Sequence, residues 1–265
     1  MRTAEQRRSG IPLLERYTRD DLAVFTPDER TSLGIDDHAD PQADPAVAWE
    51  LLYRLEPGLY DRLVSAERLH RGIVDWLPAH VDTIVEVAAG TGRLTVELLN
   101  RCDELVAIEP AAPLREILTP KLEARVNGST ASPAPRLRIM SGFFDALPQP
   151  DRSAGLVIAS SALTPDRFHG GDRGLAEMER VCAQHGLVVI VWPDGLDWLA
   201  AHGYRYCAFA GDMAMEFSSL EDAIELSQIF YPDAVDTIRR RGSPRVPYQL
   251  LGVNPPRDLA YKTIE

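Results

Sequence analysis

A strand that ends in a glycine turn constrains this chain more than any other feature. Residues 84–93 read Ile-Val-Glu-Val-Ala-Ala-Gly-Thr-Gly-Arg, and the spacing of Leu94, Leu98 and Leu99 predicts a helix directly after them. The glycines at positions 90 and 92 leave the backbone without Cβ atoms, so that ligand atoms can approach it. The N–H groups at the start of the helix favour an anionic group such as a carboxylate. The segment therefore predicts a nucleotide-type binding turn.

Short apolar runs alternate with helical patterns after this turn. The expected strands are Thr83–Val87, Leu105–Ile108, Leu137–Met140, Gly155–Ala159 and Leu187–Trp192, with a last strand around Tyr248–Val253. A helix expected over Asp172–Gln184 ends at Gly186, just before one of these strands. Alternating strands and helices predict an α/β fold with a Rossmann-like, doubly wound, mostly parallel sheet, here of seven strands.

Helices are expected on both sides of this core in the sequence. One begins at Asp44-Pro45 and stops at Pro57-Gly58, and a second runs from Leu59 to Leu77. The acidic stretch Asp36–Asp44 between the first residues and these helices reads as an exposed linker. Further on, Ser218 and Ser219 start a helix, and another ends at Arg241.

These patterns predict two parts of the chain. Residues 1–78 are expected to form an N-terminal arm and a helical cap, and residues 79–265 a core that binds the cofactor. An insertion around residues 194–245 belongs to this expected core.

A carboxylate follows the second expected strand. Glu109 stands 17 positions after Gly92, at the end of Val106-Ala107-Ile108. There it can accept hydrogen bonds from two hydroxyls of a ribose that carries no 2′-phosphate. A nicotinamide-dependent oxidoreductase uses the same parts, although Thr95 occupies its third glycine position here.

The pattern Glu86-x-x-x-Gly90-x-Gly92 resembles the first motif of class I S-adenosylmethionine (SAM) dependent methyltransferases. The series from Val81 to Pro193 is similar to that family in order and spacing, particularly to the type found in ubiquinone and menaquinone biosynthesis and in small-molecule tailoring enzymes. The resemblance implies SAM as cofactor, S-adenosylhomocysteine as product, and methyl transfer to an O, N or C atom of a small molecule. It also implies a cap that closes over the cofactor.

The resemblance also assigns roles to residues. Glu86, Ala88, Gly90, Thr91 and Gly92 would line the methionine and ribose, and Glu109 with Pro110 would hold the ribose and one side of the adenine. The loop with Phe143, Phe144 and Asp145 resembles the third motif, which closes over the adenine. Ala159 and Ser160 would end the fourth strand beneath the sulfonium.

Three positions depart from the family pattern. Ala88 replaces the first glycine, which is a small change. Phe143 stands where many relatives have an acid that binds the adenine amino group, so aromatic packing or Asp145 would have to take over that contact. Ala154-Gly155 replaces an acid that often precedes the fourth strand.

Candidates for a general base are few, because transfer from a sulfonium needs mainly alignment and the removal of one proton. His169, in the loop Thr164–Gly171 after the fourth strand, is the catalytic candidate. His70 and Tyr60 fit helix packing better, and Arg239–Arg241 fits the C-terminus of a helix better than a nucleic-acid patch. The six histidines show no metal-ligand spacing, so we expect no metal.

Charge and cysteine content restrict the partners. The 28 basic and 40 acidic residues give a formal charge of −12, which disfavours nucleic acid. Three distant cysteines make no disulfide framework, and no apolar run is long enough to span a bilayer or to form a signal peptide. We therefore expect a cytoplasmic protein with a small-molecule partner, no nucleic acid and no membrane.

Two alternatives to methyl transfer to a small molecule remain besides the oxidoreductase. The altered third and fourth motifs, with no convincing base, are compatible with a protein that binds SAM without transferring its methyl group. A methyltransferase that acts on RNA or protein would need a basic groove in spite of the acidic net charge.

Overall fold

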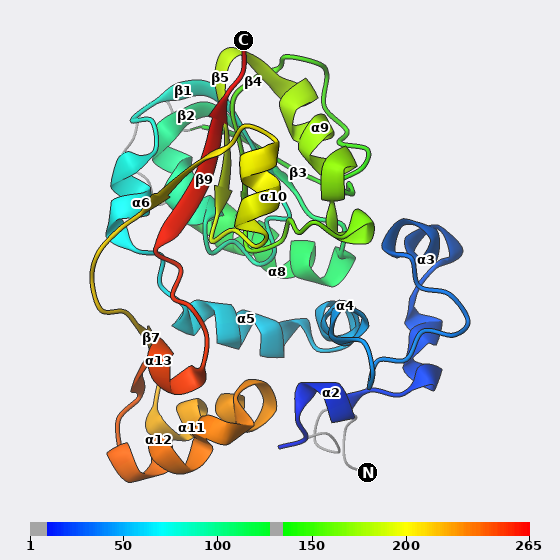
Figure 1. Ribbon diagram of the computed structural model, residues 1–265, viewed down its shortest axis with the longest axis vertical. Coiled ribbons are helices and arrows are strands. Elements are labelled where there is room, and N and C mark those ends of the chain that lie inside the picture. The colour runs from blue at the N-terminus through cyan, green and yellow to red at the C-terminus, as the bar shows by residue number, and fades with distance from the viewer. Residues whose placement is uncertain (1–9, 128–134) are drawn as a thin grey trace. The chain divides into compact units, whose positions relative to one another are not determined.

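A computed structural model of the protein describes residues 10–127 and 135–265. The expected basic N-terminal stretch Met1–Ser9 lies outside the described residues. The chain divides into two compact units (Figure 1). The sheet unit contains residues 69–210 and 256–265, and the helical unit contains residues up to Arg68 together with 211–255.

The sheet unit contains seven strands in the order β3-β2-β1-β4-β5-β9-β6. Strands β1 to β5 pair in parallel, and β9 is antiparallel to both β5 and β6. This confirms the predicted mostly parallel, doubly wound sheet of seven strands. The strands are β1 (Val81–Val87), β2 (Cys102–Ile108), β3 (Arg136–Met140), β4 (Ala154–Ser160), β5 (Cys182–Val191), β6 (Arg205–Ala208) and β9 (Asp258–Thr263).

Both faces of the sheet are covered, because successive residues of a strand point to opposite sides. Ile84 packs in one cluster with Leu118 of α8, and its neighbour Val85 packs in another with Leu175 and Met178 of α9. Burial on both faces explains why central strands such as β4 read as continuous apolar runs, whereas the edge strand β3 alternates. The helices of this unit are α6 (Arg71–Trp76), α7 (Thr95–Leu98), η2 (Leu99–Arg101), α8 (Ala112–Asn127), η3 (Arg167–His169), α9 (Gly171–Val181) and α10 (Leu196–Ala201).

The strand order reverses at β1. From β1 the chain proceeds to β2 and β3 on one side of it, and then returns to β4 and β5 on the other side. In open α/β sheets a ligand binds outside the carboxyl ends of the strands where such a reversal occurs. The fold therefore predicts a ligand site among the residues that follow β1 and β4.

The helical unit combines two separate stretches of sequence. Its elements are α2 (Leu13–Arg16), η1 (Arg19–Val24), α3 (Pro27–Leu33), α4 (Pro45–Leu55), α5 (Pro57–Ala66), β7 (Ala214–Glu216), α11 (Leu220–Phe230), η4 (Pro232–Ala234), α12 (Val235–Arg241), β8 (Arg245–Pro247) and α13 (Tyr248–Leu251). β7 and β8 form a small antiparallel pair. Between α3 and α4, the stretch Asp36–Asp44 is mostly exposed.

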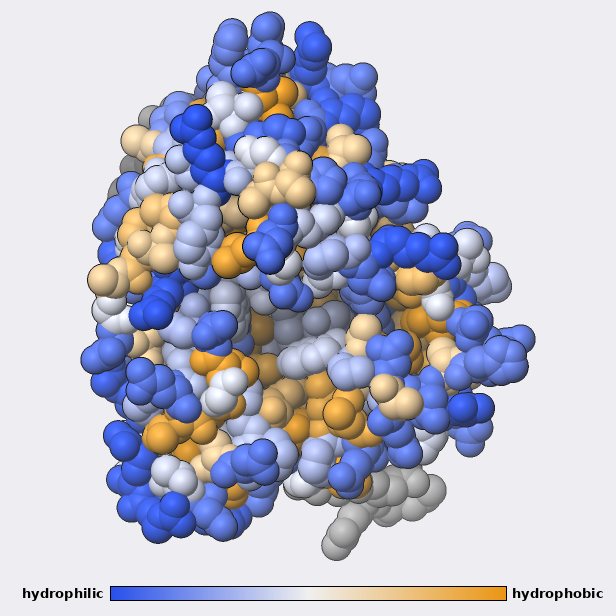
Figure 2. All heavy atoms as spheres, in the orientation of Figure 1, coloured by the Kyte–Doolittle hydropathy of each residue, from blue (hydrophilic) through white to orange (hydrophobic). Residues whose placement is uncertain are grey.

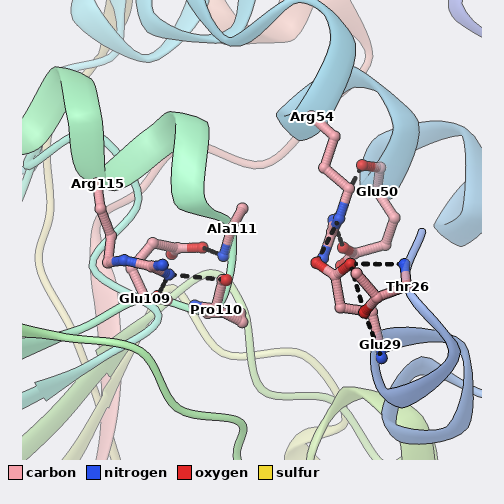
Figure 3. Close-up of polar contacts among 8 residues, drawn as sticks. All are labelled: Thr26, Glu29, Glu50, Arg54, Glu109, Pro110, Ala111 and Arg115. Carbon is pink, nitrogen blue, oxygen red and sulfur yellow. Dashed lines mark hydrogen bonds and ion pairs between the residues drawn. The ribbon is translucent and has the colours of Figure 1, made fainter. Parts of the chain in front are cut away.

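Ion pairs join the first helices of this unit. The buried guanidinium of Arg54 contacts Glu29 at 3.1 Å and Glu50 at 2.5 Å (Figure 3). Glu29 also accepts a hydrogen bond from the backbone N–H of Thr26, the residue that caps α3. Arg54 thus connects α4 to the start of α3.

The limits of the two units differ from the division expected from the sequence. α6 lies in the sheet unit, although residues up to 78 were expected in the cap. Residues 211–255, which overlap the expected insertion, lie in the same unit as the N-terminal helices. Long-range packing decides this grouping, and a local pattern does not contain that information.

The helix expected from Leu59 to Leu77 is broken. The structure has α5 and α6 with residues 67–70 between them, because His70 Nδ1 accepts a hydrogen bond from the N–H of Gly72 and caps a new helix. α4 ends at Leu55, just before Pro57-Gly58 as expected, and Pro57 also begins α5. Proline is tolerated there because the first helical residue needs no N–H donor.

The C-terminal elements also differ from expectation. The expected strand Tyr248–Val253 is the short helix α13, with Tyr248 and Leu251 buried at helical spacing, and the strand that enters the sheet is β9. The helix expected at Ser218 and Ser219 is confirmed as α11, and the Ser219 side chain accepts a hydrogen bond from the N–H of Asp222. Gly186, expected to end the preceding helix, lies within β5.

No helix within the described ranges is both long and apolar enough to cross a membrane. Hydrophilic side chains cover most of the face of the molecule that Figure 2 shows.

Candidate functional site

The turn after β1 has the backbone conformation of a close-approach turn. Gly90 and Gly92 have φ of 57° and 101°, and Ala88 also has a positive φ, of 56°. A Cβ atom at Gly92 would lie 2.7 Å from Cδ1 of Leu118 on α8, so a larger residue would displace that side chain in addition to straining the backbone. The Gly-x-Gly pattern thus fixes both the turn and its contact with α8.

Buried polar groups without partners surround this turn. Glu86 is only 2% exposed, and its Oε2 atom has no hydrogen-bond partner among the described residues. The same holds for the hydroxyl oxygens of Thr91 and Thr95, whose residues are 3% and 0% exposed. Buried polar atoms are almost always hydrogen-bonded, and exceptions are typical of positions with a functional role or a bound water or ion. Three such atoms within ten residues make this turn the candidate binding site.

Burial also changes the protonation of Glu86. The loss of hydration raises the pKa of its carboxyl to about 8. The Thr95 side chain and the positive charge of Arg93 act in the opposite direction, whereas the negative charge of Glu109 raises the pKa further. The site therefore holds a carboxyl that a cationic ligand would ionise.

Glu109 connects the end of β2 to the turn after β1. Its carboxylate accepts hydrogen bonds from the N–H of Gly90 at 2.9 Å and from that of Ala111 at 2.8 Å. Arg115 of α8 holds the adjacent backbone by donating to the carbonyls of Glu109 and Pro110 (Figure 3). A carboxylate has about four lone-pair positions and can accept several hydrogen bonds at once. Glu109 thus both fixes the turn and lies where ribose binding was expected.

Arg93 is a site residue to which the sequence analysis assigned no role. Its Nη2 donates to Oγ of Ser160 at 3.1 Å, and its guanidinium lies over the ring of Trp192, 5.4 Å from the centroid. It also interacts electrostatically with Glu86. One partly buried cation thus joins residues at the carboxyl ends of β1, β4 and β5. In the sequence, its position directly after Gly92 could have indicated that Arg93 lies at the site.

Backbone strain gathers at the same edge. Ala88, Ser161 and Trp192 have positive φ values of 56°, 55° and 52°, and they follow β1, β4 and β5. Such a conformation costs a non-glycine residue on the order of 1–3 kcal/mol and clusters at functional sites. The strained residues therefore follow the same three strands whose carboxyl ends Arg93 joins.

The loop expected over the adenine packs beside β2. At Gly142 a Cβ atom would lie 2.8 Å from Cγ2 of Ile108, the last residue of β2. Phe144 is partly buried and packs against the core cluster that includes Leu175 and Met178 of α9. Asp145 lies 3.7 Å from Arg173 in an ion pair, and Phe143 remains partly exposed. Phe143 is therefore better placed than Phe144 to contact a ligand.

The remaining expected site residues follow β4. Ala159 is fully buried in the sheet, and Ser160 is bound by Arg93. His169 ends η3, where its Nδ1 lies 3.5 Å from Asp166. Within the described part of the chain, His169 makes no hydrogen bond or ion pair with Glu86, Glu109 or Ser160. Its loop packs on Phe144, since a Cβ atom at Gly170 would lie 3.4 Å from that ring.

Three other candidates have structural contacts. His70 caps α6 and stacks on Phe209, with ring centroids 5.7 Å apart. Tyr60 packs edge-on against Tyr53 at 4.8 Å. Arg239–Arg241 forms the last turn of α12, as the helix-terminus interpretation predicted.

One group of possible metal ligands occurs among the described residues. His80, Asp82 and Asp103 can bring ligand atoms within 4.8 Å of one another, but all three are exposed. They lie around the amino-terminal ends of β1 and β2, whereas the turn follows their carboxyl ends. Exposed groups of this kind are common without an ion.

Sequence comparison gives two kinds of relative. Residues 56–140 match the family of ribosomal RNA adenine dimethylases. Uncharacterised methyltransferases of Mycobacterium bovis and Mycobacterium tuberculosis are 27% identical to the chain over 136 residues, which is 49% of this chain and 49% of theirs. The chain thus spans about half the length of these relatives.

Structural comparison finds more distant resemblances. A phosphoethanolamine N-methyltransferase of Haemonchus contortus, solved with phosphoethanolamine and S-adenosylhomocysteine, is 16% identical with a TM-score of 0.43, covering 64% of this chain and 34% of the other. A tRNA (m1A58) methyltransferase of Aquifex aeolicus is 13% identical with a TM-score of 0.43, covering 76% and 66%. These scores are low, and the fold assignment rests on the strand order itself.

Proposed function

We propose that this chain is a SAM-dependent methyltransferase that transfers a methyl group to a small molecule. The observation that carries the proposal is the set of buried polar atoms without partners, Glu86 Oε2 and the hydroxyls of Thr91 and Thr95, at the strand-order reversal. The names of the sequence relatives support the same class of reaction.

The residues present fit this cofactor. The Glu86 carboxyl can receive the ammonium group of the methionine end, because it is buried, ionisable and lacks a partner for one oxygen. Glu109 can receive the ribose hydroxyls in addition to its two backbone bonds. Phe143 can pack on the adenine, and Ala88 with Gly90 lets the nucleoside approach the backbone.

When bound, SAM supplies an electrophilic methyl group on a sulfonium. The acceptor attacks the methyl carbon in line with the bond that breaks, and the protein contributes by holding the two reactants in reacting distance and excluding water. Ser160, held by Arg93 at the end of β4, lies where the resemblance puts the floor of the reaction site.

Calorimetric titration with SAM, S-adenosylhomocysteine and NADH tests the cofactor. We expect micromolar or tighter binding of the two adenosyl ligands and none of NADH. Binding of NADH alone would favour the oxidoreductase and contradict the proposal. Binding of SAM, with no product from any acceptor tried, would favour the protein that binds SAM without methyl transfer.

A second candidate acceptor is RNA, which the match to ribosomal RNA adenine dimethylases favours. The matched residues 56–140 include β1, β2 and β3, which belong to the cofactor side of the site. The formal charge of −12 opposes binding to a phosphate backbone. Methylation of ribosomal RNA by radiolabelled SAM, with affinity falling steeply as salt rises, would select RNA over a small molecule.

His169 remains our proposed general base for hydroxyl or amine acceptors, because its loop follows β4 at the carboxyl edge. The variant His169→Gln keeps hydrogen-bonding capacity without basicity. Once an acceptor is known, we expect this variant to lower kcat and to leave the affinity for S-adenosylhomocysteine unchanged. Unchanged kcat across the pH range would remove His169 from the mechanism.

A further inference from the structure

The proposed cofactor contacts include no partner for the α-carboxylate of the ligand, and Arg93 is the side chain that could supply one. The amino-acid group of the cofactor is a zwitterion, with an ammonium and a carboxylate on one carbon. In the proposed function, the Glu86 carboxylate pairs with the ammonium group. The sequence placed the carboxylate at the N–H groups of the helix after the turn.

The helix after the turn is too short for this task. α7 spans only Thr95–Leu98 and continues as the 3₁₀ turn η2. A helix dipole sums over aligned peptide units, so a single turn provides a weak field. In addition, the N–H groups of Gly92 and Val96 are already bonded to the carbonyls of Ala89 and Gly92.

The side chain of Arg93 supplies a full positive charge at the same place. It interacts electrostatically with the buried Glu86, and its guanidinium is oriented by Ser160 Oγ and by the Trp192 ring. A carboxyl at the end of β1 and a guanidinium held at the ends of β4 and β5, within electrostatic range of each other, complement the two charges of an α-amino acid. A guanidinium also binds a carboxylate in a planar, two-bond geometry that an ammonium side chain does not offer.

We propose that Arg93 binds the α-carboxylate of the cofactor and forms, with Glu86, a receptor for its zwitterionic amino-acid group. This inference rests on the proposed function, because it assigns a ligand group within the same site. It makes Arg93 a residue that discriminates ligands by their carboxylate, and not only a support for Ser160 and Trp192.

A cycle of protein and ligand changes tests the assignment. The affinities of S-adenosylhomocysteine and of its decarboxylated analogue, which keeps the amino group, are measured by calorimetry for the wild type and for Arg93→Met. In the wild type we expect removal of the carboxylate to weaken binding roughly 10- to 100-fold, as for loss of a charge-assisted hydrogen bond. In Arg93→Met the two ligands should bind within about 3-fold of each other, because the partner of the carboxylate is gone.

Two further variants complete the experiment. Arg93→Lys keeps the charge and should restore part of the preference for the carboxylate. Arg115→Met removes another arginine at the same edge, whose side chain donates to the backbone carbonyls of Glu109 and Pro110. It should change the affinities of both ligands by the same factor.

The outcomes separate this inference from the proposed function. If Arg93→Met weakens both ligands equally, Arg93 only supports the site and the assignment is wrong, while cofactor binding by the wild type stands. If the wild type binds neither ligand, the proposed function fails and the assignment fails with it. Thermal melting of each variant verifies that the protein is folded.

Discussion

Two buried carboxylates, one in each unit, show how differently the same group can be used. Glu56 of the helical unit is 6% exposed and accepts hydrogen bonds from Nε and Nη2 of Arg16, both at 2.7 Å, and from the hydroxyl of Tyr17 at 2.8 Å. Glu86 of the sheet unit is 2% exposed, and one of its oxygens has no described partner. The Glu56 carboxylate is saturated by side chains of its own unit, whereas the Glu86 carboxyl keeps one oxygen available for a ligand.

The different surroundings of Glu56 and Glu86 predict different effects of substitution on stability. Arg16→Met removes two donors from Glu56 and should lower the free energy of unfolding by about 3–5 kcal/mol, because a buried charge loses its partner. Glu86→Gln, in contrast, should not destabilise the ligand-free protein. Urea unfolding at pH 7 measures both variants. An Arg16→Met protein as stable as the wild type would show that the Glu56 cluster is not structural.

Substitution of glycine in the turn should reduce ligand affinity more than it reduces folding stability. Gly90→Val fills the space of the nucleoside and should weaken S-adenosylhomocysteine binding more than about 100-fold. The valine also strains the backbone at a φ of 57°, at a cost of about 1–3 kcal/mol. Gly242, which ends α12 at a φ of 64° in open space, provides the matched control. Gly242→Val should lose similar stability and bind normally. Normal binding by Gly90→Val would refute the central claim.

The raised pKa of Glu86 predicts a pH dependence. Below about pH 8 the ligand-free carboxyl is protonated, and an ammonium group must displace that proton. The affinity for S-adenosylhomocysteine should therefore rise up to about tenfold per pH unit below pH 8 and level off above it. Calorimetry in buffers of different ionisation enthalpy should detect the released proton. Glu86→Gln should abolish this release, and a wild type that releases no proton would exclude a protonated Glu86.

The same pKa has a consequence for folding. The unfolded chain loses the Glu86 proton near the ordinary pKa of 4.5, and the folded protein keeps it up to about 8. Because the folded state binds more protons in this window, stability falls as pH rises from about 5 to 8. Comparing melting temperatures of the wild type and Glu86→Gln across this range checks the sign, since the variant should lack this contribution.

The smallest expected effect concerns the partnerless hydroxyls. Thr91→Val keeps the shape of the side chain and should weaken S-adenosylhomocysteine binding about 3- to 10-fold, the value of one hydrogen bond, without loss of stability. Ser227 in α11 of the helical unit also has a buried hydroxyl without a described partner. Ser227→Ala should leave binding unchanged. Equal behaviour of the two variants would mean that Thr91 does not face the ligand.

The sheet was predictable because its strands are buried on both faces. A continuous apolar run such as Leu105–Ile108 can be identified from the local sequence alone. The structure contains all five of these expected strands, β1 to β5. The last strand was misplaced, because both Tyr248–Val253 and Asp258–Thr263 are short and only the pairing of β9 with β5 and β6 distinguishes them. Similarly, the break at His70 depends on one capping bond that periodicity does not reveal.

By itself, the sequence determined the doubly wound sheet and the position of the glycine turn, because both follow from local spacing and from the conformational freedom of glycine. Only the tertiary structure decided which polar groups lack partners, which distant segments share a unit, and that Arg93 lies with Ser160 and Trp192. Those properties depend on contacts between strands that are far apart in the chain. A carboxylate such as Glu86 or Glu56 looks the same in the sequence, and its surroundings in the fold give it its role.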